Sequence, residues 1–192
     1  MLGKRGDIVN ALKLLVKTAA EEINMAGEHS AKDVMAAIRS GDVSEVEKIL
    51  SGDDKLLHLI TPLGSWLHIA TEQGQDKIVE LLVNLGIDVN VKGGPSGVTP
   101  LNTAAYEGHL DLLTYFLERN AVMDISEPDR NPLFAAIHAG HKNIVELLLK
   151  AGIDTKVKYT GNSMKDMDAI AFTYEWGRKE IAEMIKEHNR HA

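Results

Sequence analysis

The chain has no cysteine, which excludes disulfide bonds and thiolate metal ligands. It also has no Asn-x-Ser/Thr site for N-glycosylation. Both absences fit a reducing compartment, so we expect a cytoplasmic protein. No apolar run approaches the ~20 residues that a membrane-spanning helix needs. Near the N-terminus, Asp7, Asn10 and Lys13 interrupt the apolar residues, so we do not expect a signal peptide.

Basic residues are in the minority. The chain has 21 lysines and arginines against 28 acidic residues, which gives a net charge of −7. Nucleic acid and anionic membranes are therefore disfavoured as partners, because binding their phosphates needs a basic face. A protein partner with a basic or mixed surface is easier to accommodate.

Glycines that end short apolar segments recur at a nearly fixed period. They are Gly41, Gly74, Gly108, Gly140 and Gly177, separated by 33, 34, 32 and 37 residues. A second apolar stretch follows each of them, as at residues 78–82 and 144–149. A period of this length is typical of a stacked array of helix pairs, and differs from the pattern of a globular enzyme core.

The repeats also share short motifs. Residues 97–105 read Gly-Val-Thr-Pro-Leu-Asn-Thr-Ala-Ala, and residues 131–136 read Asn-Pro-Leu-Phe-Ala-Ala; Gly-His follows each, at 108–109 and 140–141. This pattern resembles the ankyrin repeat over about residues 31–188. The resemblance implies an all-α ankyrin-repeat solenoid of about five helix-turn-helix repeats with projecting finger loops.

The expected organisation has three parts. Residues 1–30 form an N-terminal cap with an amphipathic helix over 7–24, since apolar residues recur there at three- and four-residue spacing. A partner-binding or dimerising helix is the alternative for this segment. The repeats are expected at about 31–60, 61–93, 94–126, 127–159 and 160–188, and residues 189–192 form a tail.

Local chemistry supports these elements. Pro100 and Pro132 suit the first turn of a helix, and Thr99 and Asn131 before them can cap free amides. The short-helix glycines permit a left-handed backbone at little cost. The resemblance implies structural roles for three histidines: His68 in its Thr-Pro-Leu-His position, and His109 and His141, whose rings hold turns by hydrogen bonds.

The sequence carries none of the catalytic motifs that its residue types could form. The glycine-rich segment 93–97 lacks the Gly-Lys-Ser/Thr of a phosphate-binding loop, and no Gly-x-Ser-x-Gly motif is present. His138 and His141 are separated by Gly140 at a helix end, so they need not share a metal-binding face. We expect no enzyme activity, no cofactor and no metal site.

The resemblance implies that the two positions before each short-helix glycine face a concave groove. Tyr106 and Trp176 hold such positions in a chain that is only 5% aromatic, and these residue types are frequent at binding hot spots. Packing of Trp176 under the longest finger, around Tyr159, is the alternative. The predicted partner-binding residues are Glu72, Gln73, Tyr106, Glu107, His138, Glu175 and Trp176, with Glu127 and Asp129 on a finger.

Other aromatic residues and loops complete the prediction. Trp66, which replaces the proline of other repeats, is expected in the core, with a groove anchor as the alternative, and Tyr174 is expected in the core. Fingers are expected as turns at residues 91–98, 123–130 and 156–166, because their glycine and proline content marks turns.

These observations predict a non-catalytic, monomeric module that binds a partner protein through the groove and fingers. An immunity or inhibitor protein that neutralises a cognate toxin or enzyme is one alternative. A structural scaffold or self-assembling adaptor is another.

Overall fold

The computed structural model describes residues 29–161 and 164–191. The helix predicted over residues 7–24 lies outside the described residues. The described part is mostly helical, as the predicted ankyrin-repeat solenoid requires, and it also contains one two-stranded sheet. It divides into two compact units, one ending at Gly97 and the other beginning at Val98.

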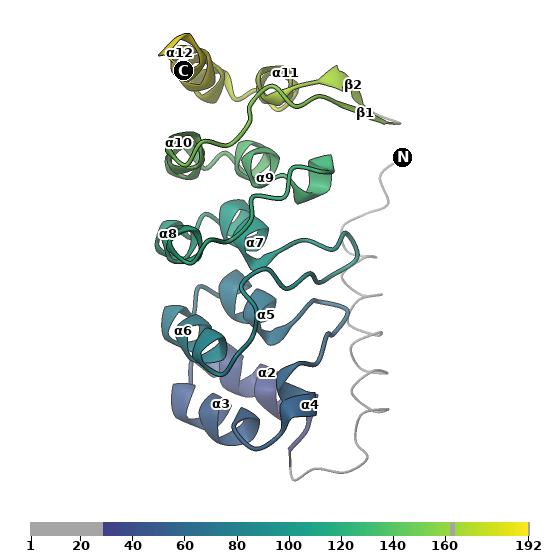
Figure 1. Cartoon of the computed structure of the whole chain (residues 1–192), viewed down its shortest axis with the longest axis vertical. Coiled ribbons are helices and arrows are strands. Elements are labelled where there is room, and N and C mark those ends of the chain that lie inside the picture. Colours follow the sequence, from purple (N-terminus) through teal and green to yellow (C-terminus); the bar gives the residue numbers. More distant parts are fainter. Residues whose placement is uncertain (1–28, 162–163, 192) are drawn as a thin grey trace. The chain divides into compact units, whose positions relative to one another are not determined.

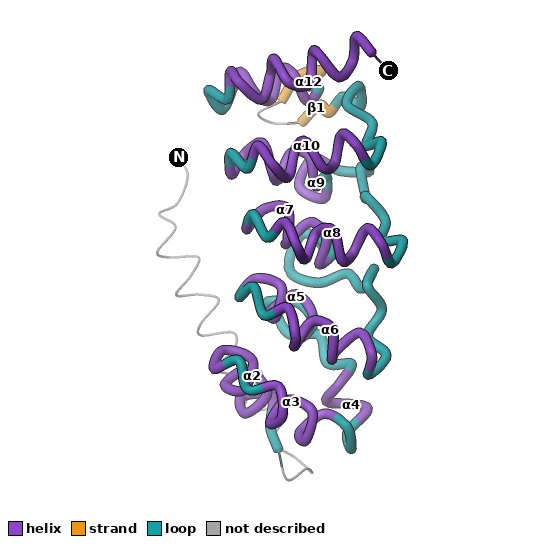
Figure 2. The backbone as a smooth tube through the Cα atoms, turned by 90° about the vertical axis from the view of Figure 1, so that its left-hand side faces the viewer, coloured by secondary structure: helices purple, strands orange, loops and turns teal. Residues whose placement is uncertain are grey.

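The first unit stacks two helix pairs. The helices of its described residues, 29–97, are α2 (Ala31–Ser40), α3 (Val43–Leu50), α4 (Asp54–Leu57), α5 (Trp66–Glu72) and α6 (Asp76–Asn84). Helix α2 packs on α3 and α5 packs on α6, and the pairs meet through α2 with α5 and α3 with α6 (Figure 2). This is the pairing that the repeat period predicts.

Trp66 lies at the start of α5 and is fully buried. Its indole Nε1 donates a hydrogen bond of 2.6 Å to the carbonyl oxygen of Leu56 on α4. The prediction that Trp66 belongs to the core is therefore confirmed, and the groove-anchor alternative is excluded. Tryptophan can replace proline here because its ring fills the space beside α4 and its polar atom finds a partner.

The second unit contains three further helix pairs and a hairpin. Its elements are α7 (Pro100–Glu107), α8 (Leu110–Glu118), the short 3₁₀ helix η1 (Pro128–Arg130), α9 (Pro132–Ala139), α10 (Lys142–Lys150), β1 (Tyr159–Gly161), β2 (Met164–Met167), α11 (Ala169–Glu175) and α12 (Lys179–His191). Figure 1 shows α7, α9 and α11 in one row and α8, α10 and α12 in a second row to its left. Fully buried Leu113, Leu133, Ile137 and Ile144 fill the space between the rows.

The helix ends follow the sequence signals. Thr99 Oγ1 accepts from the amide of Asn102 at 3.4 Å, and Asn131 Oδ1 accepts from the amide of Leu133 at 2.9 Å. Gly108 and Gly140 adopt left-handed backbone at φ 83° and 88°. The predicted caps and glycine-terminated short helices are thus confirmed.

Two details of the second unit differ from the prediction. The third finger contains an antiparallel hairpin, β1 with β2, where turns alone were expected. Buried Tyr159 anchors this hairpin. From the sequence alone, a tyrosine buried at the start of a strand cannot be distinguished from a tyrosine in a loop. Helix α12 continues through His191, so residues 189–191 extend the last helix, although a tail was expected there. Contacts of Glu187 with Arg190 and His191 accompany this extra turn.

Candidate protein-binding surface

Three predicted site residues come together on the second unit. The rings of Tyr106 and His138 stack with centroids 5.7 Å apart and planes 19° apart. The ring of Trp176 meets that of His138 edge-to-face, with centroids 4.1 Å apart. Tyr106 is the penultimate residue of α7, His138 lies on α9 and Trp176 caps α11, so one ring comes from each successive repeat. We call these three residues the aromatic ladder.

Trp176 stands one position later in its repeat than the other two ladder residues. Tyr106 and His138 are two residues before their glycines, whereas Trp176 directly precedes Gly177. The larger indole still reaches His138. Trp176 is 45% exposed, so it is not buried under the third finger as the alternative required, and the ring of Tyr159 packs edge-to-face on that of Phe134.

A buried group of phenylalanines supports the ladder from below. Phe172 stacks on Phe134 with centroids 4.3 Å apart, and its ring lies 6.1 Å from that of Trp176. Both phenylalanines are buried. Contacts of this kind fix ring orientation, so the ladder is held in place before any partner binds.

The backbone beneath the ladder is held by the next repeat. His141 Nε2 donates to the carbonyl oxygen of Tyr106 at 3.0 Å. Arg178 donates to the carbonyl oxygens of His138 at 2.8 Å and Ile137 at 3.3 Å. The structural role predicted for His141 is therefore confirmed. Arg178 was not predicted, although its place directly after Gly177 matches the place of His141 after Gly140.

His68 also has its predicted structural role, in the first unit. Its ring is buried and Nδ1 accepts from the Ser65 amide at 3.2 Å, which closes a capping box at the start of α5. Gly64 and Gly93 lie against the same ring, where an added Cβ would come within 2.8 and 2.9 Å of its atoms. This histidine is therefore part of the scaffold.

A polar network fixes the second finger to the third. The buried Tyr159 hydroxyl donates to the carbonyl oxygen of Ile125 at 2.7 Å and accepts from Asn131 Nδ2 at 3.0 Å. Burial raises the pKa of this hydroxyl above its ordinary value of 10.0. The neutral side chain thus joins residues 123–130 to the hairpin.

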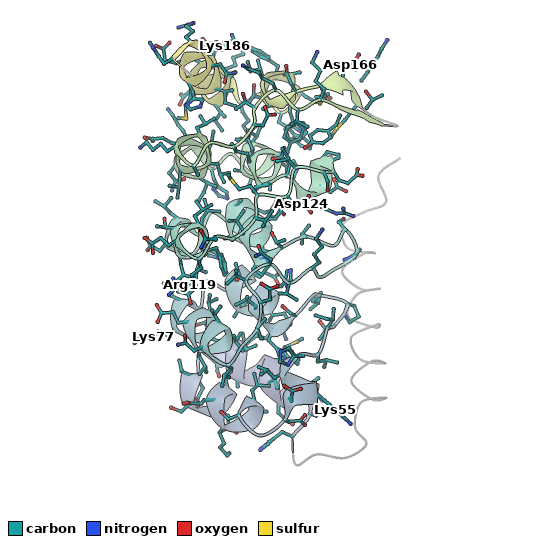
Figure 3. All side chains as sticks on the ribbon, in the orientation of Figure 1. Lys55, Lys77, Arg119, Asp124, Asp166 and Lys186 are labelled. Atoms are coloured by element: carbon teal, nitrogen blue, oxygen red, sulfur yellow. The ribbon has the colours of Figure 1, made fainter. Side chains whose placement is uncertain are left out.

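The remaining predicted residues are exposed carboxylates and one amide. Glu107 and Glu175 are neighbours of ladder residues in the chain, and Glu127 and Asp129 lie on the second finger. Figure 3 marks two more finger carboxylates, Asp124 and Asp166. Glu72 and Gln73 are exposed at the end of α5 in the first unit. The ring contacts of the second unit bring together Tyr106, His138 and Trp176.

The prediction for Tyr174 is wrong. This residue is 49% exposed, and its hydroxyl accepts a hydrogen bond from Lys186 Nζ at 2.6 Å. Ala169, Phe172 and Thr173 form the buried face of α11, and Tyr174 lies one position beyond that face. The residues at the corresponding position of earlier repeats are small or apolar, so they did not indicate that Tyr174 would face away from the core.

Other kinds of site find no support in the described residues. Within residues 29–161 and 164–191, no three histidine or acidic side chains lie close enough together to hold a metal ion. Over the same ranges, no helix has the length and apolar character to cross a membrane.

Comparison with known proteins identifies the family. The family described as ankyrin repeats (3 copies) matches residues 34–129 and, in a second overlapping match, residues 67–159. The chain therefore belongs to the ankyrin-repeat family, whose members are generally protein-interaction modules.

Relatives carry these repeats in different settings. Protein phosphatase 1 regulatory subunit 27 of Mus musculus is 30% identical over 118 residues, which cover 61% of this chain and 76% of the relative. "Probable E3 ubiquitin-protein ligase XBOS32" of Oryza sativa subsp. japonica is 31% identical over 142 residues, 71% of this chain and 28% of the relative. Palmitoyltransferase Hip14 of Drosophila melanogaster is 37% identical over 91 residues, 46% of this chain and 14% of the relative. The chain thus spans only a minor part of the two larger relatives.

Proposed function

We propose that this chain is a non-catalytic module that binds a partner protein through the aromatic ladder and the neighbouring fingers. The observation that carries the proposal is the stack of Tyr106, His138 and Trp176 across three repeats, with Trp176 45% exposed at its end. Exposed aromatic side chains on a rigid support bury a large area at low entropic cost when a partner binds.

Regulation of an enzyme is the second candidate function. The name of the mouse relative, a protein phosphatase 1 regulatory subunit, favours it, since that relative matches this chain over most of its length. Such a role would use the same surface, and the partner's activity would change when this protein binds.

The proposal is tested by affinity capture from lysate of the source cells. The full chain serves as bait beside the Tyr106→Ala/Trp176→Ala variant, and captured proteins are identified by mass spectrometry. Tyr174→Ala is the matched control, because Tyr174 is a similarly exposed aromatic residue on α11 outside the ladder. Circular dichroism and thermal unfolding establish that each variant is folded.

We expect one stoichiometric partner that the ladder variant loses and the control retains. Affinity for the purified partner should fall by more than ~2 kcal/mol in the ladder variant. Equal affinity of the ladder variant and the control would contradict the proposal. A change in the catalytic rate of the captured partner would support the regulatory role.

A further inference from the structure

Trp176 differs from two other aromatic residues of the second unit, Tyr115 and Tyr174. The Arg119 guanidinium lies 3.6 Å from the ring centroid of Tyr115, and Lys186 Nζ lies 5.2 Å from that of Tyr174. Figure 3 labels both cations, Arg119 after α8 and Lys186 on α12. Among the described residues, no cation covers the indole of Trp176, which is the ring type that attracts cations most strongly.

A carboxylate accompanies this uncovered indole. Glu175 directly precedes Trp176, is exposed and has no ion pair within the described ranges. The nearest basic residue in sequence, Arg178, donates to two backbone carbonyls and is half-buried. The end of α11 therefore presents a partly exposed indole and a negative charge that no described side chain neutralises.

Among the cationic side chains, arginine suits the Trp176 indole and the Glu175 carboxylate best. A guanidinium is planar, stacks on an aromatic face and donates hydrogen bonds to a carboxylate from its edge. An ammonium can make the charge contact, but it is more strongly hydrated and does not stack. The contacts of Trp176 with His138 and Phe172 hold the indole in place, so little side-chain entropy is lost when the cation binds.

We infer that Trp176 and Glu175 form a subsite for an arginine side chain of the partner. The inference rests on the partner-binding function proposed above and specifies the chemistry of the bound segment. The guanidinium lies over the indole and donates to the Glu175 carboxylate, and the rest of the segment continues along the ladder toward His138 and Tyr106.

The test uses the full chain and three capped peptides of sequence Gly-X-Gly-X-Gly, in which X is arginine, citrulline or lysine. Citrulline keeps the shape of arginine without its charge. Binding is followed by NMR through the indole N–H signal of Trp176. The indole N–H of buried Trp66, bonded to the Leu56 carbonyl, serves as an internal reference that should not move.

We expect a saturable shift of the Trp176 signal with the arginine peptide. The dissociation constant should be at least about threefold higher for the citrulline and lysine peptides. Glu175→Gln should weaken arginine-peptide binding by about threefold or more, whereas Glu118→Gln, which removes the same charge from α8, should not.

Equal binding of the arginine and citrulline peptides would overturn the inference, and so would the absence of any saturable shift up to about 10 mM peptide. Neither result would alter the loss of the native partner in the Tyr106→Ala/Trp176→Ala capture experiment. Failure of the arginine subsite can therefore be told apart from failure of the proposed function.

Discussion

The Tyr159 hydroxyl shows how one polar atom can position an entire loop. It is bonded to Ile125 on the second finger and to Asn131, whose own Oδ1 caps α9. One hydroxyl therefore links a finger, a hairpin and a helix start. Because Asn131 is buried and Ile125 is half-buried, removing the hydroxyl leaves a donor and an acceptor without this bond in places that water reaches poorly.

Tyr159→Phe should lower the free energy of unfolding by about 1–3 kcal/mol, since the unpaired Asn131 amide and Ile125 carbonyl lose their partner. Tyr174→Phe, at an exposed tyrosine, should change it by less than ~0.5 kcal/mol. Urea denaturation of both variants measures the difference. A loss of the same size in both would contradict the role given to the buried network.

The same hydroxyl sets a pH dependence. Its pKa is raised in the folded state, so above the unfolded value of 10.0 the unfolded chain releases this proton more readily than the folded chain. The hydroxyl therefore makes its full contribution to the free energy of unfolding below pH 10, and this contribution falls as the pH rises further. The wild-type protein should therefore lose more stability above pH 10 than Tyr159→Phe does.

Among the secondary-structure elements, the glycine-terminated ends of the short helices connect one repeat to the next. Gly108 leaves room for the ring of His141, and Gly140 leaves room for the guanidinium of Arg178. An added Cβ would lie 2.6 Å from the first and 2.8 Å from the second. In both places the polar group then bonds a carbonyl of the preceding short helix. The glycine thus serves both the turn and the contact between repeats.

Gly108→Ala and Gly152→Ala separate these two roles. The backbone angles are alike, φ 83° and 81°, but a Cβ at Gly152 would meet nothing within 4 Å. Gly152→Ala should cost about 1 kcal/mol of unfolding free energy, from the left-handed backbone alone. Gly108→Ala should cost ~1–3 kcal/mol more, because the His141 ring must move.

Adding His141→Ala to Gly108→Ala removes the clash. The double variant should therefore be more stable than the sum of the two single changes implies. Thermal and urea unfolding of the four variants measures this coupling. Equal costs at Gly108 and Gly152, or strict additivity in the double variant, would contradict the account.

The same contacts mark how far the sequence could be interpreted alone. Period, caps and left-handed glycines are local signals, so the helix pairs, Thr99, Asn131 and Gly108 were predictable. Contacts between repeats depend on side-chain direction. The sequence predicted Tyr106 and Trp176 on one surface, but it did not predict that their rings would be joined through the ring of His138. The burial of Tyr159 and the exposure of Tyr174 depend on packing, which the sequence does not show directly.

At the scale of the whole molecule, the negative charge should govern the rate at which a partner associates. The net charge is −7, and Glu107, Glu175, Glu127 and Asp129 are exposed near the proposed binding surface. A partner with a basic patch would be attracted over distances comparable with the Debye length, so its association would be faster at low salt. The ladder acts mainly after contact, through buried area, and should affect dissociation more than association.

Association with the captured partner should therefore slow by about an order of magnitude between ~20 mM and ~500 mM salt in stopped-flow measurements. The Glu107→Gln/Glu175→Gln variant should show a weaker salt dependence, because it loses charge at the binding surface. The Glu118→Gln/Glu146→Gln variant has the same net charge but loses its carboxylates from α8 and α10, so it should behave like the wild-type protein. Equal slopes in the two variants would show that overall charge attracts the partner, and an association rate indifferent to salt would exclude electrostatic steering by this face.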